Sequence, residues 1–222
     1  HMVDTTVAHE KASRDDVRKR STELLRMVRL DSDVVLNRYP HELSGGMKQR
    51  TVSAIAMLLK PKLLILDEPT SALDILTQKF FIRILRDLRK DLGLTMIFIT
   101  HDLASVAEVA DRVAVMYGGT IVEASSVENI FYRPRHPYTK ALLSAIPSIV
   151  GDVDKLKPLP GPLPDPVSPP PGCEFHPRCP YARDRCSNTR PALEEIEDMW
   201  LVACHRLREE EGGGIREKVE RY

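Results

Sequence analysis

A short apolar run, Leu63–Leu66, leads directly into two adjacent carboxylates, Asp67 and Glu68. Pro61 and Pro69 stand on either side and leave too little room between them for a helix. A run of this kind is typical of a strand buried on both faces of a parallel sheet. Because ligands gather at the carboxyl ends of strands in open α/β sheets, the sequence predicts a buried strand that carries two acids to a ligand site.

A second motif precedes this strand and has the sequence Leu43-Ser44-Gly45-Gly46-Met47-Lys48-Gln49-Arg50. Ser44 is a typical helix N-cap, and capping alone would explain it. Gly45 and Gly46 indicate more, because glycines let an anion approach the backbone and the helix dipole. We expect this turn to open a helix and to bind phosphate.

Strands and helices alternate along the first part of the chain. Helices are predicted at about 13–30, 45–60, 74–92 and 104–110, and strands at 62–66, 95–100 and 112–116. Gly118 and Gly119 predict a hairpin turn into 120–123, and a further helix follows Arg135-His136-Pro137-Tyr138. The order strand, helix, strand, helix, strand predicts an open parallel α/β sheet.

Three side chains are placed for phosphate chemistry at the edge of that sheet. Asp67 is expected to hold Mg²⁺ through water, and Glu68 to orient and deprotonate an attacking water. His101 follows the next strand and can contact the same phosphate or water. The alternatives are that the acids form a solvated strand end and that His101 and Asp102 cap the start of a helix.

Composition excludes two classes of partner. The 32 basic and 32 acidic residues cancel, so no overall field favours nucleic acid or a membrane surface. The chain also lacks the apolar run of about 18 residues that suggests a membrane span. We therefore expect no nucleic-acid partner, and membrane association only through another protein.

These motifs, in this order, resemble those of ABC transporter ATPases over about residues 5–131. Leu43–Arg50 resembles the signature motif, Leu63–Glu68 the Walker B strand, Ser71–Asp74 the D-loop and His101 the switch histidine. The resemblance implies a partial P-loop NTPase sheet, with a helical subdomain at about 10–60 and a Walker B and H-loop core at 61–131.

The resemblance also implies roles for individual residues. The signature turn, with Ser44, Gly45, Gly46 and Gln49, would close on the γ-phosphate of ATP held by an opposite subunit. Asp67 would serve Mg²⁺, Glu68 would act as the general base, and His101 would hold the γ-phosphate and water. Asp74 would lie at the interface between the two subunits.

One required motif is missing. Phosphate-binding NTPases carry Gly-x-x-x-x-Gly-Lys-Ser/Thr, and no Gly-Lys-Ser or Gly-Lys-Thr occurs in the 222 residues. We expect a piece that begins partway through a larger protein, and we expect it not to hydrolyse ATP by itself.

Four cysteines follow a proline-rich stretch at 156–171, which predicts a semi-extended linker; Gly212–Gly214 predict a mobile tail. The thiols could form a disulfide, a zinc site or an iron–sulfur site, and their spacing does not separate the two metals. The stretches 135–138 and 171–180 resemble the C-terminal extension of oligopeptide and dipeptide importer ATPases, here residues 132–222. That resemblance implies a [4Fe–4S] cluster, with zinc as the alternative, on Cys173, Cys179, Cys186 and Cys204.

The sequence as a whole thus predicts an ATP-hydrolysing subunit of a peptide importer at the cytoplasmic face of the membrane. Its expected partners are a second ATPase subunit, identical or different, the transmembrane permease subunits and, indirectly, an extracellular solute-binding protein. The alternatives are a metal-binding interaction module, a nickel or sugar importer ATPase, and a chromosome-maintenance ATPase. The last would need a long coiled coil, which the sequence lacks.

Overall fold

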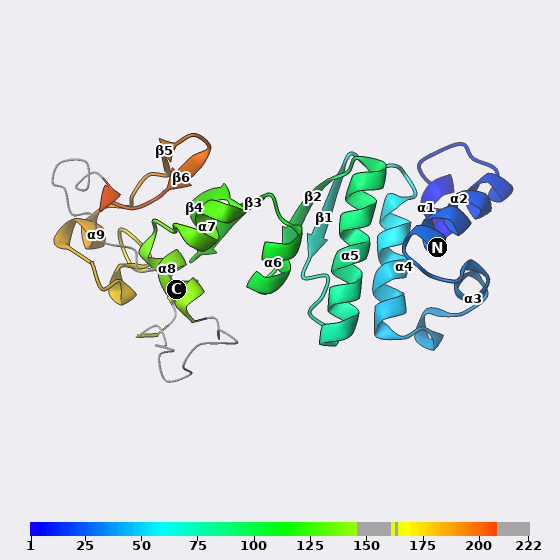
Figure 1. Cartoon of the computed structure of the whole chain (residues 1–222), viewed down its shortest axis with the longest axis horizontal. Helices are drawn as coiled ribbons and strands as arrows, with labels where there is room; N and C mark the ends of the chain where they lie inside the picture. The colour runs from blue at the N-terminus through cyan, green and yellow to red at the C-terminus, as the bar shows by residue number, and fades with distance from the viewer. Residues whose placement is uncertain (146–160, 163, 208–222) are drawn as a thin grey trace. The chain divides into compact units, whose positions relative to one another are not determined.

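The computed structural model describes residues 1–145, 161–162 and 164–207, which form two compact units, His1–Ala110 and Asp111–Tyr222 (Figure 1). The predicted linker lies partly, and the predicted tail wholly, outside the described residues. Within the described part, no helix combines the length and apolar character that a membrane crossing requires. The domain boundary suggested after residue 131 remains a prediction.

Helices dominate the first unit, and polar caps set where they begin. Ser13 caps α2, Ser44 caps α4 and Asp74 caps α5, each accepting a hydrogen bond from a backbone N–H of the first turn. Gly93 ends α5 in the left-handed conformation, with φ of 62°. The helices are α1 (Met2–Val7), α2 (Arg14–Met27), α3 (Ser32–Leu36), the 3-10 turn η1 (Pro40–Glu42), α4 (Gly45–Met57), α5 (Ile75–Leu92) and α6 (Leu103–Val109).

Two strands of this unit, β1 (Leu63–Asp67) and β2 (Thr95–Ile99), pair in parallel, with Asp67 opposite Ile99. In Figure 1 the strand pair, α5, α4 and α2 follow one another as successive layers. Leu64 and Leu66 pack on α5, and a second core joins the helices. The predicted parallel pairing and the helix between the strands are confirmed.

The prediction that β1 is buried on both faces is wrong for the chain as described. Its residues alternate, so that Leu64 and Leu66 are buried whereas Ile65 is 60% exposed. In β2, Ile97 and Ile99 are likewise exposed. The reason is that α5 covers one face of this two-stranded sheet while the outward-facing apolar side chains stay open to solvent.

The prediction of a third parallel strand is also wrong. β3 (Arg112–Tyr117) pairs antiparallel with β4 (Thr120–Ser126) in a second sheet of order β3-β4-β6-β5. The reason is the turn at Gly118 and Gly119, which have φ of 55° and 81° and bring the chain straight back as the predicted hairpin. The remaining strands of this sheet are β5 (Glu194–Glu197) and β6 (Trp200–Val202).

Aromatic side chains form much of the core of the second unit. Tyr117, Tyr138 and Phe175 have ring centroids 4.6 to 5.5 Å apart and join three separate segments of the chain. Short helices surround them: α7 (Val127–Tyr132), α8 (Pro137–Ser144), the 3-10 turn η3 (His176–Arg178) and α9 (Asp184–Asn188). The cysteine segment is therefore packed against the hairpin and α8.

Candidate functional site

Glu68 and His101 meet at the carboxyl ends of β1 and β2. The imidazole Nδ1 lies 2.9 Å from Glu68 Oε1, and since a carboxylate only accepts, Nδ1–H is the donor. This hydrogen bond and the charge of Glu68 raise the pKa of His101, although both side chains are largely exposed. The pair therefore puts a carboxylate and a proton-carrying imidazole at one point of the sheet edge.

The backbone at Glu68 is held in an uncommon conformation. Glu68 has φ of 44°, which few residues other than glycine adopt. Its N–H donates to the Ile99 carbonyl at 2.9 Å, and its carbonyl accepts from both the N–H and the hydroxyl of Ser71. These bonds extend the pairing of β1 with β2 by one residue and turn the chain, which gives Glu68 a fixed place beside His101.

A cavity of about 150 Å³ opens beside this pair and is lined by Glu68, Thr70, Ser71, Leu73, Gln78, Thr100, His101 and Asp102. Pockets for whole ligands usually enclose about 300 Å³ or more. The cavity can therefore hold a phosphate group with a few waters, but it cannot enclose a nucleotide. Asp67, the last residue of β1, is exposed at the same sheet edge.

The glycine turn lies against the start of α5. The side chain of Ser44 accepts from Met47 N–H at 3.3 Å and caps α4. A Cβ on Gly46 would come within 2.7 Å of Thr77 Cγ2, whereas one on Gly45 would meet only Ala72 O, at 4.0 Å. Gly46 is thus required for the close approach of α4 to α5.

Asp74 receives three hydrogen bonds from its own turn. Its carboxylate accepts from the N–H groups of Leu76 and Thr77 and from the Thr77 hydroxyl at 2.6 Å. The bond from that hydroxyl is the main reason why the pKa of Asp74 lies below its usual value. Asp74 is therefore the ionised, exposed N-cap of α5. It lies one helical turn before Thr77, the residue that Gly46 faces.

Arg50 anchors the other end of the signature turn. Its guanidinium donates to the carbonyls of Val28 and Arg29, its Nε donates to Gly46 O, and the group stacks 5.3 Å over the ring of Phe80. The side chain thus ties α4 to α2 and α5. Gln49 is half-buried in the first half of α4.

The four cysteines line one pocket of the second unit, of about 40 Å³, together with His136 and several arginines. All four are free thiols, which excludes a disulfide in this structure. Burial raises the pKa of Cys173 and Cys179, and it raises that of Cys204 to about 11. In the described residues no group of three or more His, Cys, Asp or Glu side chains is placed to hold a metal ion.

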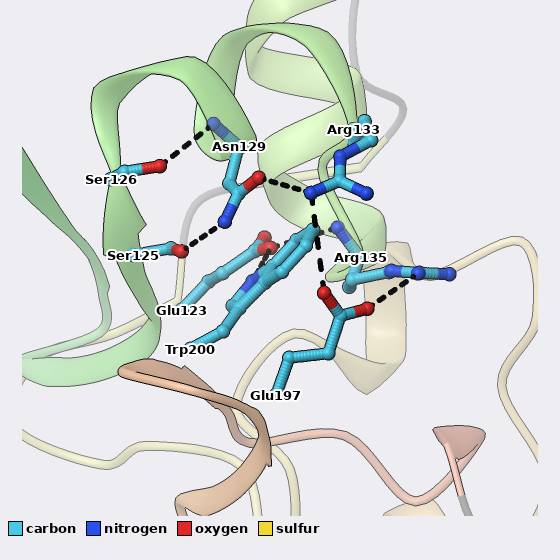
Figure 2. Close-up of polar contacts among 8 residues, drawn as sticks. All are labelled: Glu123, Ser125, Ser126, Asn129, Arg133, Arg135, Glu197 and Trp200. Carbon is cyan, nitrogen blue, oxygen red and sulfur yellow. Dashed lines mark hydrogen bonds and ion pairs between the residues drawn. The ribbon is translucent and has the colours of Figure 1, made fainter.

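A buried carboxylate organises the segment that leads to this pocket (Figure 2). Glu123 is fully buried and accepts from the N–H groups of Arg135 and His136 and from Trp200 Nε1, at 2.8 to 3.0 Å. The guanidinium of Arg135 also stacks 5.2 Å from the indole and pairs with Glu197. This carboxylate therefore joins β4 to β6 and to the start of α8.

His136 is held in the neutral form. Its Nδ1 accepts from Tyr138 N–H at 3.1 Å and so caps α8. The ring is almost fully buried, and burial lowers its pKa from 6.5 to about 4. The sequence singled out the segment 135–138, but nothing in the sequence pointed to its buried partners Glu123 and Trp200.

Several residues of the sheet-edge site were missed by sequence reasoning. Gln78 and Ser105 both donate hydrogen bonds to the carboxylate of Asp102, a residue for which the sequence suggests only a helix cap. A signal was available for Gln78, because it follows Asp74 by one helical turn and faces the same way. No comparable spacing signals Ser105.

Comparison with known proteins agrees with this geometry. The ABC transporter family model matches residues 2–71, and the model of the oligopeptide/dipeptide transporter C-terminal region matches residues 122–186. The first part of the chain is thus similar to ABC transporter ATPases, and the second part to the oligopeptide/dipeptide branch of that family. These matches confirm the resemblance found in the sequence.

The relatives are similar over nearly the whole chain. It is 50% identical over 210 residues to the dipeptide transport ATP-binding protein DppD of Caldanaerobacter subterraneus subsp. tengcongensis, covering 94% of the chain and 64% of that protein. It is 44% identical to the oligopeptide transport ATP-binding protein AppD of Bacillus subtilis, covering 95% of the chain and 64% of that protein. The chain thus spans less than two thirds of these curated relatives.

A solved structure supports the fold. The chain is similar to cbiO1 from Clostridium perfringens, part of the ABC transporter complex cbiONQ, with 31% identity and a TM-score of 0.52. The match covers 57% of the chain and 50% of cbiO1. The matched part of the chain therefore has the mixed helix and sheet architecture of the ABC ATPases.

Proposed function

We propose that this chain is part of the ATP-hydrolysing, energy-coupling subunit of an ABC importer for oligopeptides or dipeptides. The observation that carries the proposal is the 2.9 Å contact between Glu68 and His101 at the carboxyl ends of neighbouring parallel strands. Glu68 would take the proton of an attacking water, and His101 would hold the water and the γ-phosphate. The match to the ABC transporter family model supports ATP and Mg²⁺ as the ligands.

The size of the cavity supports a site that a second molecule completes. A space of about 150 Å³ fits the phosphate end of a nucleotide but not the whole. Ser44, Gly45, Gly46 and Gln49 would contact the ATP of an opposite subunit, and Asp74 would lie at that interface. Asp67 would hold Mg²⁺ through water. The chain alone, with no Gly-Lys-Ser/Thr, would then not hydrolyse ATP.

The partners of the whole protein follow from the same proposal. A second ATPase subunit, identical or different, would close on this one, and membrane permease subunits would convert that motion into transport. An extracellular binding protein would deliver the peptide, and the ATPase would sit at the cytoplasmic face of the membrane. The names of the relatives, which include dipeptide and oligopeptide transport proteins, support peptides over nickel or sugars.

Phosphate release tests the catalytic part of the proposal. The chain alone should release no phosphate above background. The same chain, extended at its amino end with a segment that carries Gly-x-x-x-x-Gly-Lys-Ser/Thr, should hydrolyse ATP, and Glu68→Gln should abolish that turnover. Glu68-dependent hydrolysis by the chain alone would refute its inactivity. Unchanged turnover in the extended Glu68→Gln variant would refute the role of Glu68.

The thiol pocket supports a second element of the proposal. Cys173, Cys179, Cys186 and Cys204 line one pocket. In the described structure these side chains are not gathered closely enough to hold a metal ion, but four thiolates are the donors that a [4Fe–4S] cluster or zinc takes. Such a group, when bound, would supply cross-links to a segment with little core of its own. Because burial raises the pKa of the Cys173, Cys179 and Cys204 thiols, binding must release protons from them. Anaerobic reconstitution should give a brown protein with iron and sulfide; a colourless protein with stoichiometric zinc would favour zinc, and no metal would refute both.

A further inference from the structure

Gln78 connects helix α5 to the His101 loop, which is residues 100–102 between β2 and α6. The amide Nε2 of Gln78 lies 2.5 Å from Asp102 Oδ2 and 2.9 Å from Ser105 Oγ. Gln78 stands in the first turn of α5, directly after the Asp74 cap, and its side chain lines the same cavity as Glu68 and His101. One side chain thus reaches from the α5 turn to the start of α6.

Both neighbours of His101 in the chain are held by this arrangement. Asp102 donates its N–H to Thr100 Oγ1 at 3.0 Å, and its carboxylate accepts from the N–H groups of Ala104 and Ser105. Burial opposes ionisation of Asp102, but the hydrogen bonds from Ser105, Ala104 and Gln78 outweigh it, and the pKa of Asp102 is lowered. An ionised Asp102 accepts strong hydrogen bonds, so the link to Gln78 is charge-assisted.

His101 itself has no such support. Its side chain is 77% exposed and reaches across to Glu68. An exposed imidazole keeps one direction only if the backbone that carries it is fixed. The bonds among Asp102, Thr100 and Ser105 join the loop only to α6, which follows it directly. Gln78 connects the loop to α5.

We propose that Gln78 is a positioning residue, which holds the His101 loop against the first turn of α5 and so directs the imidazole toward Glu68. The Asp74 cap and the His101 loop are then joined by a single helical turn. A displacement of that turn would move His101 relative to Glu68. This inference rests on the proposed role of His101, but its geometry does not depend on ATP hydrolysis.

Nuclear magnetic resonance titration of His101 in this chain tests the proposal. In Gln78→Met, which keeps the length of the side chain and removes the donor, the raised pKa of His101 should fall most of the way to the value measured in Glu68→Gln. Gln78→Lys restores a donor and should retain most of the raised pKa. Because the measurement needs no turnover, it separates this proposal from the catalytic one.

Arg89 provides the matched control. It lies on the same helix and donates to the Val109 carbonyl at 3.2 Å, at the far end of α6. Arg89→Met therefore weakens the contact of α5 with α6 away from His101 and should leave the pKa of His101 unchanged. An unchanged pKa in a folded Gln78→Met, or an equal fall in Arg89→Met, would overturn the proposal. If Gln78→Met does not fold, Ser105→Ala gives the second test. It removes the hydroxyl that donates to Asp102 and accepts from Gln78, so the pKa of His101 should fall, and an unchanged pKa would overturn the proposal.

Discussion

Acidification should destabilise the second unit through one buried histidine. His136 is 1% exposed, and its Nδ1 accepts the N–H of Tyr138. A proton on Nδ1 would remove that acceptor and place a charge where water cannot reach it. Folding therefore opposes protonation of this side chain, and stability must depend on pH over the range that separates the folded pKa from the unfolded one.

The size and sign follow from the two pKa values. The unfolded chain binds the proton near 6.5, whereas the folded chain binds it only near 4. The contribution of neutral His136 to the free energy of unfolding is therefore fully present above pH 6.5, and it is lost as the pH drops from 6.5 to 4. The difference corresponds to about 3 kcal/mol, at about 1.4 kcal/mol per pKa unit. Since small domains are stable by only about 5–15 kcal/mol, such a loss would be large.

Urea denaturation followed by tryptophan fluorescence measures this loss. Trp200 is the one tryptophan of the chain and is fully buried in the same unit, so its signal reports on that unit alone. His136→Asn is the matched variant, because asparagine can still cap α8 but does not titrate. The free energy of unfolding should fall by about 3 kcal/mol more in the parent than in this variant between pH 7 and pH 4. Equal pH dependence in both proteins would refute the reasoning.

Two further substitutions test packing and hydrogen bonding. Gly46→Ala should lower the free energy of unfolding by about 1–3 kcal/mol, because its Cβ would press on Thr77, whose hydroxyl is bonded to Asp74. Gly45→Ala is the control and should lower the free energy of unfolding less in the same denaturation experiment. Equal effects would contradict the close approach of α4 to α5. Glu123→Gln should cost about 1–3 kcal/mol, since the amide turns an N–H toward another donor. The exposed Glu197→Gln should cost under about 1 kcal/mol, and a similar loss in both variants by tryptophan fluorescence would argue against the buried network.

Local signals were sufficient for most elements of the first unit. Ser13, Ser44 and Asp74 begin helices where their side chains predict caps, and Gly93 ends one. These features depend on neighbours a few residues away, and so they can be read along the chain. The placement of Glu68 beside His101 could also be predicted, because parallel strands end at the same edge of a sheet.

Pairing partners and buried polar contacts could not be predicted in this way. The pattern of 112–116 suits either a parallel or an antiparallel strand, and the choice was made by β4 and by the distant β6. The burial of β1 likewise depends on which faces other elements cover. The sequence by itself determined the caps, the turns and the acids with their histidine, because short-range chemistry suffices for them. Only the tertiary structure decided that Gln78 reaches Asp102 and that Glu123 meets Trp200, because those partners are 24 and 77 residues apart.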